Sequence, residues 1–212
     1  MKYKHIVIEW IHGSWKSAVS DALVQRLSEK GIDTKYYHFP NEAEHLGKAI
    51  REVLTIEDVY KKREVTWLLY AAMTNKFHIT TQNDGTVYIL DREAVTSWLI
   101  FQKDIPDAVR TEIYKYGIKS LQEQWIVLYV KIDKNTALDR LQLRNADLSA
   151  KGEVRDHKSK DKFVVDNFER LTAEYEKDFI PKVKALWLQC EVIDNSGTLE
   201  HTIQQIEEII GA

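Results

Sequence analysis

The sequence predicts an α/β fold in three layers, with a parallel sheet of roughly five strands and helices on both faces. Two observations support this prediction. Five short runs are apolar at consecutive positions, which is typical of strands that are buried on both faces. Segments with helical periodicity separate these runs, and this alternation indicates parallel strands that are joined by crossover helices.

The expected strands come from the apolar runs, and the expected helices come from the segments between them. The strands are Ile6–Glu9, Thr34–His38, Val87–Asp91, Ile126–Ile132 and Glu191–Asp194. The helices are Ser17–Lys30, Leu46–Leu54, Ile56–Thr74, Asp107–Tyr116, Lys134–Arg144, Lys162–Leu186 and Leu199–Ile210. Ligands of such folds bind beyond the carboxyl ends of the strands, where Glu9, His38 and Asp91 are expected.

Composition indicates one globular domain over residues 1–212. The chain is 44% hydrophobic and 30% charged, which excludes a disordered protein. Its formal net charge of -3 provides no basic field for nucleic acid or anionic lipid. The single cysteine, Cys190, excludes an internal disulfide framework and a cysteine-based metal site. Because no apolar run has transmembrane length and no signal-peptide pattern begins the chain, we expect a cytoplasmic protein.

A candidate phosphate-binding loop lies between the first expected strand and the first expected helix. Segment 8–18 reads IEWIHGSWKSA and is similar to the pattern G-x-x-x-x-G-K-[ST], with Lys16 and Ser17 at its last two positions. In such a loop, backbone N–H groups surround a phosphate at a helix N-terminus, where the helix dipole also favours an anion. From the loop alone, a chance match of Gly-Ser-x-Lys-Ser is the alternative.

Tryptophan occupies both positions of this pattern that require glycine. A bulky residue reaches the backbone angles of the loop only with strain of about 1–3 kcal/mol, and an indole would compete with phosphate for space. The chain has 8 glycines and 6 tryptophans, so glycine falls well below its usual share of about 7%. One hypothesis is that Trp10, Trp15, Trp98, Trp125 and Trp187 are glycines encoded by UGA and translated as tryptophan. If the tryptophans are genuine, we expect a relative that binds nucleotide poorly.

An acid–base pair follows the apolar strand Val87–Asp91. The aspartate could support Mg²⁺ through water, and Arg92 could neutralise a phosphoryl group during transfer. A surface ion pair is the alternative. Further along, residues 145–162 are rich in charge and poor in apolar side chains. This stretch is either a solvated surface loop or a mobile lid, since lids come from poorly buried segments.

Taken in order, these motifs resemble those of the thymidylate kinase family, whose members phosphorylate dTMP to dTDP with ATP. The matching segments are Glu9 to Ser17, Phe39-Pro40, Gly47 to Arg51, Leu68 to Ala72, Gly85 to Glu93, Thr96-Ser97, Phe101-Gln102, Leu128–Arg144 and Ile193 to Ser196. They span essentially the whole chain. The resemblance implies a P-loop kinase fold of α/β/α layers with a small lid at about 145–162. It also implies ATP as phosphoryl donor, Mg²⁺ as cofactor, and a homodimer.

The resemblance implies roles for individual residues as well. The ATP-binding positions would be Trp10, Ile11, His12, Gly13, Ser14, Trp15, Lys16 and Ser17. The substrate-binding positions would be Phe39, Pro40, Arg51, Tyr70, Thr74, Arg92 and Gln102. The catalytic residues would be Lys16, Asp91, Arg92, Arg144 and Arg155, with Ser17 and Asp91 supporting the metal. The alternatives to these functional roles are structural: core packing for Phe39 and Tyr70, and a solubilising charge cluster for the lid arginines.

Three departures from the family pattern concern the acceptor nucleotide. His12 replaces an acidic residue of the phosphate loop, and Glu93 replaces the usual tyrosine or histidine after Asp-Arg. Thr74 stands where the family usually carries an arginine for the acceptor phosphate, although Lys76 follows two residues later. A kinase of another nucleotide or nucleoside, and a non-catalytic P-loop relative, therefore remain alternatives to a dTMP kinase.

Overall fold

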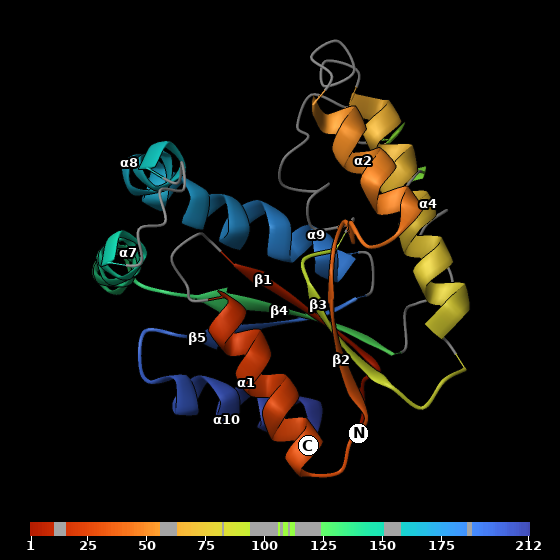
Figure 1. The fold of residues 1–212 in the computed structure, drawn as a ribbon, viewed down its shortest axis with the longest axis horizontal. Coiled ribbons are helices and arrows are strands. Elements are labelled where there is room, and N and C mark those ends of the chain that lie inside the picture. The colour runs from red at the N-terminus through yellow and green to blue at the C-terminus, as the bar shows by residue number, and fades with distance from the viewer. Residues whose placement is uncertain are drawn as a thin grey trace.

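The computed structural model describes residues 1–10, 16–55, 63–81, 83–93, 106, 108–109, 111–112, 124–150, 158–185 and 188–212. Its centre is a sheet of five parallel strands in the order β2-β3-β1-β4-β5 (Figure 1). The strands are β1 (His5–Trp10), β2 (Thr34–His38), β3 (Val87–Asp91), β4 (Trp125–Lys131) and β5 (Gln189–Asp194). The predicted α/β class and the five predicted strands are confirmed, with shifts of one or two residues at some ends.

The central strand β1 has both of its faces covered by helices. Ile6, Ile8 and Trp10 point to one face, where α1 (Lys16–Glu29) and α10 (Leu199–Ile210) pack on the sheet. Val7 points to the other face, toward α4 (Arg63–Thr81), the π-helical turn η1 (Tyr175–Phe179) and α9 (Ile180–Ala185). Figure 1 shows α1 and α10 on one side of the sheet and α9 on the other. The three predicted layers are therefore present.

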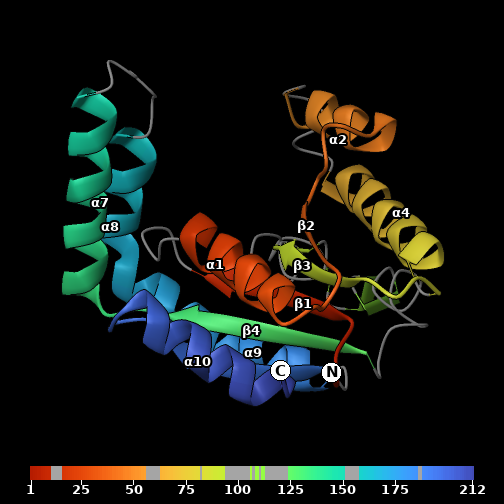
Figure 2. The same ribbon diagram turned by 60° about the horizontal axis from the view of Figure 1, so that its bottom comes forward.

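Two helix pairs stand at opposite ends of the sheet, with α1 between them (Figure 2). One pair is α2 (His45–Thr55) with α4, and the other is α7 (Lys134–Ala150) with α8 (Lys158–Glu174). Helix α10 (Leu199–Ile210) has the predicted bounds. Thr198 caps its start, and Gly211 ends it in a left-handed conformation with φ 69°.

Several helix boundaries differ from the prediction. Helix α4 continues to Thr81 instead of ending at Thr74, because its last turns bury Phe77 and His78 against the sheet. Helix α7 runs six residues beyond Arg144, and α8 begins four residues before Lys162. Both flanks of the expected lid are therefore helical, and residues 151–157 lie outside the described residues. The predicted helix 107–116 falls mostly outside them as well.

The long helix expected over Lys162–Leu186 is interrupted. Helix α8 ends at Glu174, and the next five residues form η1 before α9 begins. Short π-helical turns often occur at functional sites, because they redirect a side chain without ending the helix. Here the turn buries Tyr175 and Phe179 over the sheet.

Two of the tryptophans that the sequence suggested to be glycines occupy ordinary strand positions. Trp10 and Trp125 are each about 1% exposed and rank among the largest fully buried side chains. Neither has a positive φ, so the backbone at these two positions does not require glycine. The indole of Trp10 packs in the core beneath α1. The expected steric need for glycine therefore does not apply at these two positions, while Trp15, Trp98 and Trp187 lie outside the described residues.

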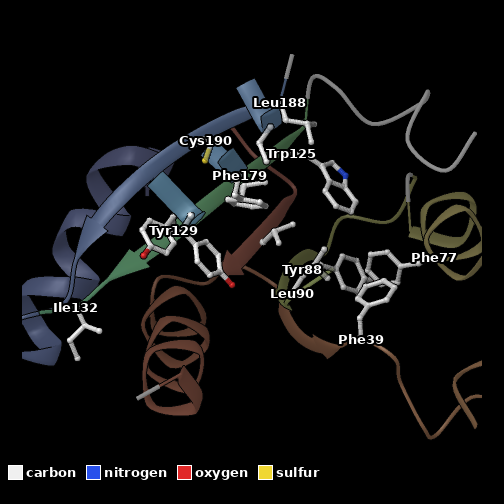
Figure 3. Close-up of a cluster of buried hydrophobic side chains, with 14 of the residues drawn as sticks. Phe39, Phe77, Tyr88, Leu90, Trp125, Tyr129, Ile132, Phe179, Leu188 and Cys190 are labelled. Carbon is white, nitrogen blue, oxygen red and sulfur yellow. The ribbon is translucent and has the colours of Figure 1, made fainter. Parts of the chain in front are cut away.

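Two histidines are buried together near the amino end of β1. The rings of His5 and His78 lie 5.2 Å apart, and each lies 4.9 Å from the indole of Trp125. His5 Nε2 is 3.0 Å from Thr81 Oγ1. Burial lowers the pKa of both histidines to about 3, with a further contribution from Lys4 for His5 and from His5 for His78. Figure 3 shows Trp125 above the aromatic group that contains Tyr88 and Phe77.

This pair should make stability depend on pH. An unfolded histidine titrates near 6.5, so below that value the unfolded chain binds more protons and folding weakens. For each buried histidine, the free energy of unfolding should fall by about 1.4 kcal/mol for each pH unit that the pH is lowered between about pH 6 and 4. His78→Phe should therefore reduce the slope of stability against pH by roughly this amount in urea unfolding. The exposed His45→Gln is the control; an equal slope in both variants would contradict the prediction.

Gly47 in the first turn of α2 permits a close backbone contact. A Cβ at this position would overlap the carbonyl oxygen of Asn41, in the segment that follows β2. We expect Gly47→Ala to lower the free energy of unfolding by about 2–3 kcal/mol, because the segment must move away. Gly85→Ala is the control, since a Cβ there meets nothing within 4 Å. Equal urea midpoints for the two variants would contradict the close contact.

Candidate active site

The polar residues at the carboxyl ends of β1 and β3 form the candidate active site. Ile8 of β1 pairs with Asp91 of β3, and His38 of β2 pairs with the same aspartate, so three strands end close together. Glu9, Asp91 and Glu93 are each about 1% exposed. Buried carboxylates are costly unless positive charge or hydrogen bonds stabilise them, and such sites are often functional.

Asp91 is held from the neighbouring strand. Its Oδ2 accepts a hydrogen bond of 2.6 Å from the Tyr36 hydroxyl and lies 3.2 Å from His38 Nδ1. Burial, together with the hydrogen bond to Asp91, raises the pKa of Tyr36, so this hydroxyl remains a donor. Asp91 has the same side-chain direction as Ile89, which packs in the core beneath α1. The carboxylate is therefore on the face of the sheet that α1 covers.

Arg92 has an unusual backbone and a partly buried side chain. Its φ is 60°, a positive value that non-glycine residues rarely adopt. This backbone strain costs about 1–3 kcal/mol. Its N–H donates to the carbonyl of Ile8 at 3.2 Å. Burial acts to lower the pKa of Arg92, but Tyr175, Glu9 and Asp91 outweigh it and leave the pKa raised. The strained turn thus holds one permanent positive charge among the site carboxylates.

Two of the unusual residues of the sequence contact each other. Thr74 Oγ1 on α4 donates a hydrogen bond of 2.5 Å to Glu93 Oε1, and both side chains are buried. One turn before Thr74, the half-buried Tyr70 has a pKa that burial raises, whereas Arg51 and Arg92 act to lower it. Tyr70 is therefore influenced by two of the predicted substrate-binding arginines, and Thr74 lies beside it on the same helix.

The other predicted substrate residues are placed as follows. Phe39 is buried in the core, with its ring 4.9 Å from Tyr37 and 5.6 Å from Phe77 (Figure 3). It thus contributes to core packing, and Pro40 beside it is buried too. Arg51 is half-exposed, and its Nε lies 2.8 Å from Glu42 Oε1. Such exposed ion pairs contribute little stability. The Arg51 guanidinium can therefore leave Glu42 and bind another anion at little cost in free energy.

The predicted donor-side residues are at the start of α1. Lys16 is the first residue of this helix, and Ser17 is exposed in its first turn. Residues 11–15 and Gln102 lie outside the described residues. The N-terminus of α1 carries no acidic residue in its first turn, so its unpaired N–H groups and helix dipole favour an anion.

Of the two predicted lid arginines, only Arg144 lies among the described residues. Arg144 Nη2 on α7 lies 2.5 Å from Asp161 Oδ2 on α8, and Asn145 Nδ2 donates to the same oxygen at 3.2 Å. This pair joins the two helices that flank residues 151–157. Arg155 lies outside the described residues. In the structure, Arg144 therefore holds α7 to α8.

Sequence reasoning missed Tyr36 and Tyr175 as members of the site. Tyr36 is two residues before His38 and points to the same face of β2, so its direction toward Asp91 could have been inferred from strand periodicity. Tyr175 lies more than eighty residues from Asp91 in the sequence and has the appearance of a core residue in a helix. Only the packing of η1 on the sheet brings its hydroxyl to the end of β1, at 3.2 Å from the Trp10 carbonyl.

A magnesium site among the described residues would depend on the bound nucleotide. Among them, no group of three or more histidine, cysteine, aspartate or glutamate side chains could hold a metal ion alone. Mg²⁺ commonly uses one or two protein ligands together with water and phosphate oxygens, so Ser17 and the buried Asp91 would suffice. None of the helices in the described part of the chain is long and apolar enough to cross a membrane.

Comparison with known proteins identifies the family. The profile described as thymidylate kinase matches residues 8–180 of this chain. The thymidylate kinase of Schizosaccharomyces pombe is 27% identical over 209 residues, which cover 97% of this chain and 90% of that protein. The thymidylate kinase of Brachyspira hyodysenteriae is 29% identical over 143 residues, 66% of this chain and 69% of that protein. The thymidylate kinase of Ligilactobacillus salivarius is 26% identical over 149 residues, 66% and 71% respectively. Because the profile matches most of the chain, the protein belongs to the thymidylate kinase family.

Proposed function

We propose that this chain transfers the γ-phosphoryl group of ATP to dTMP and forms dTDP. The observation that carries the proposal is the partly buried Arg92, held by a strained turn beside Glu9 and Asp91 at the carboxyl ends of β1 and β3. A fixed positive charge at this position can neutralise a phosphoryl group during transfer. The family to which the chain belongs supports the same reaction.

Donor binding would use the start of α1. The main chain of residues 10–15, Lys16 and the helix dipole would hold the ATP phosphates. Ser17 and Asp91 would hold Mg²⁺, which when bound would neutralise charge on the phosphate oxygens. Tyr36 would keep the Asp91 carboxylate in one orientation through its 2.6 Å hydrogen bond. Catalysis would thus come from positioning and charge neutralisation, without a covalent intermediate.

Acceptor binding would use the opposite face of the sheet, between α2 and α4. Tyr70 would stack on the base, Phe39 and Pro40 would support the pocket, and Gln102 would contact the edge of the base. Arg51 would leave Glu42 and approach the acceptor phosphate. Arg144 and Arg155 are proposed to act from the lid, for which Arg144 would have to leave Asp161.

A second acceptor deserves a test, because one contact favours it. The buried Thr74–Glu93 pair places a carboxylate and a hydroxyl on the acceptor side, and a neighbouring carboxylate opposes the binding of a phosphate. A nucleoside would therefore be the preferred acceptor if this contact selects against the phosphate of dTMP. We also infer a single kinase domain that works as a homodimer in the cytoplasm, as the resemblance implies.

Turnover assays with ATP test the proposal. We expect the highest kcat/KM with dTMP among the deoxynucleoside monophosphates and deoxynucleosides. The chain with Trp10 and Trp15 should bind ATP weakly, and Trp10→Gly/Trp15→Gly should bind it at least tenfold more tightly, because glycine at position 15 permits the loop conformation and leaves space for phosphate. Thermal unfolding must be followed in parallel, since the Trp10 indole is fully buried. If both proteins are inactive on every acceptor, the chain is a non-catalytic relative.

The role of Asp91 can be separated from that of its neighbour. Asp91→Asn should lower kcat about a hundredfold or more and raise the Mg²⁺ concentration needed for half-maximal rate, because the charge beside the metal is lost. Tyr36→Phe keeps that charge and removes one hydrogen bond, so its loss should be about tenfold or less. Magnesium titrations of the rate measure both effects. An unchanged magnesium requirement in Asp91→Asn would contradict the metal role.

A further inference from the structure

Tyr175 connects a distant part of the chain to the end of β1. It is the first residue of η1, and its hydroxyl donates to the carbonyl oxygen of Trp10 at 3.2 Å. Trp10 is the last residue of β1, and the main chain continues from it into residues 11–15. Because the contact is made with a backbone carbonyl, it does not depend on which residue occupies position 10.

The direction of the Trp10 carbonyl explains why a partner is useful there. Successive carbonyls of a strand point alternately to the two neighbouring strands, and the Ile8 carbonyl accepts from Arg92 on the β3 side. Two residues later, the Trp10 carbonyl faces the same side. The pairing of β1 with β3 has ended at Ile8 and Asp91, and the chain turns away at Arg92 with φ 60°. The Tyr175 hydroxyl thus donates to the Trp10 carbonyl at a position beyond the last paired residues of β1 and β3.

The Tyr175 side chain is itself firmly placed. It is 2% exposed, its ring stacks on Tyr129 of β4 at 4.7 Å and 12°, and it meets the edge of Phe179 at 5.4 Å. Burial raises the pKa of Tyr175 well above its ordinary value. Glu9 of β1 adds to this effect through its charge and through a hydrogen bond with the Tyr175 hydroxyl, while Arg92 opposes it. The hydroxyl therefore stays protonated and lies within the electrostatic influence of two site residues.

We propose that the Tyr175 hydroxyl is a positioning group for phosphoryl transfer, because it fixes the main chain at the end of β1 relative to η1. This inference rests on the proposed kinase function. The segment α8–η1 starts beside the lid, so the same tyrosine links the lid helix to the strand that leads into the phosphate loop. Its loss should affect the geometry of the transfer step more than the binding of either substrate.

Tyr129 provides a matched control. Its ring stacks on that of Tyr175, and its buried hydroxyl has no hydrogen-bond partner among the described residues. Tyr175→Phe and Tyr129→Phe thus each remove one hydroxyl from the same stacked pair, but only the first breaks a contact with β1. Phe179→Leu loosens the packing of η1 without touching either hydroxyl and controls for a general loss of stability.

Steady-state kinetics and amide hydrogen exchange test the inference together. Tyr175→Phe should lower kcat about tenfold and leave the KM values for ATP and dTMP within about twofold. Tyr129→Phe and Phe179→Leu should keep kcat within about twofold. Exchange of the amides in peptides that cover residues 5–10 should be several-fold faster only in Tyr175→Phe.

The outcomes separate this inference from the proposed function. If the parent chain turns over dTMP and Tyr175→Phe has the kcat of Tyr129→Phe, the inference is wrong and the function stands. A rise in KM alone, or an equal loss of kcat in Phe179→Leu, would also overturn it. If the parent shows no turnover, the proposed function fails, and the exchange rates decide whether Tyr175 fixes the end of β1.

Discussion

The central position of β1 is the constraint on which the rest of the structure depends. All six residues of this strand are buried, because β3 and β4 bond to its two edges and helices cover its two faces. A strand in this position admits little change of register, since a shift by one residue would exchange the side chains of the two faces. The end of β1 is therefore a fixed point, and Asp91, Arg92, α1 and η1 are all arranged around it.

The site combines several buried carboxylates with one partly buried guanidinium. Glu9 and Asp91 stabilise the positive charge of Arg92, whose backbone is strained. Removing one member of such a group leaves an uncompensated charge in a poorly solvated place, which costs several kcal/mol in comparable cases. Asp91 faces α1, whereas Tyr175 and Tyr129 belong to the core on the opposite face. The sheet thus separates Asp91 from these two tyrosines.

The tryptophans illustrate how local and tertiary arguments can differ. The glycine hypothesis for position 10 depends on the pattern of phosphate loops, whereas in the structure the Trp10 indole fills space between the sheet and α1. Large side chains are tolerated in a core when the surrounding helices accommodate their volume. Trp125 is different, because its buried Nε1 has no hydrogen-bond partner among the described residues and it contacts two neutral histidines. A buried donor without a partner is unusual, so the codon at position 125 is worth reading beside those at 10 and 15.

The sequence by itself determined the elements whose pattern is local. Apolar runs predicted all five strands, and the predicted bounds Leu199–Ile210 of α10 were matched to the residue, because burial on both faces and helical periodicity leave direct marks in the sequence. The tertiary structure decided the rest. Helix α4 extends to Thr81 because Phe77 and His78 pack on the sheet, and Arg144 pairs with Asp161 because α7 and α8 run together. Tyr175 reaches the Trp10 carbonyl only through the fold, since a contact between residues 165 positions apart has no local signature.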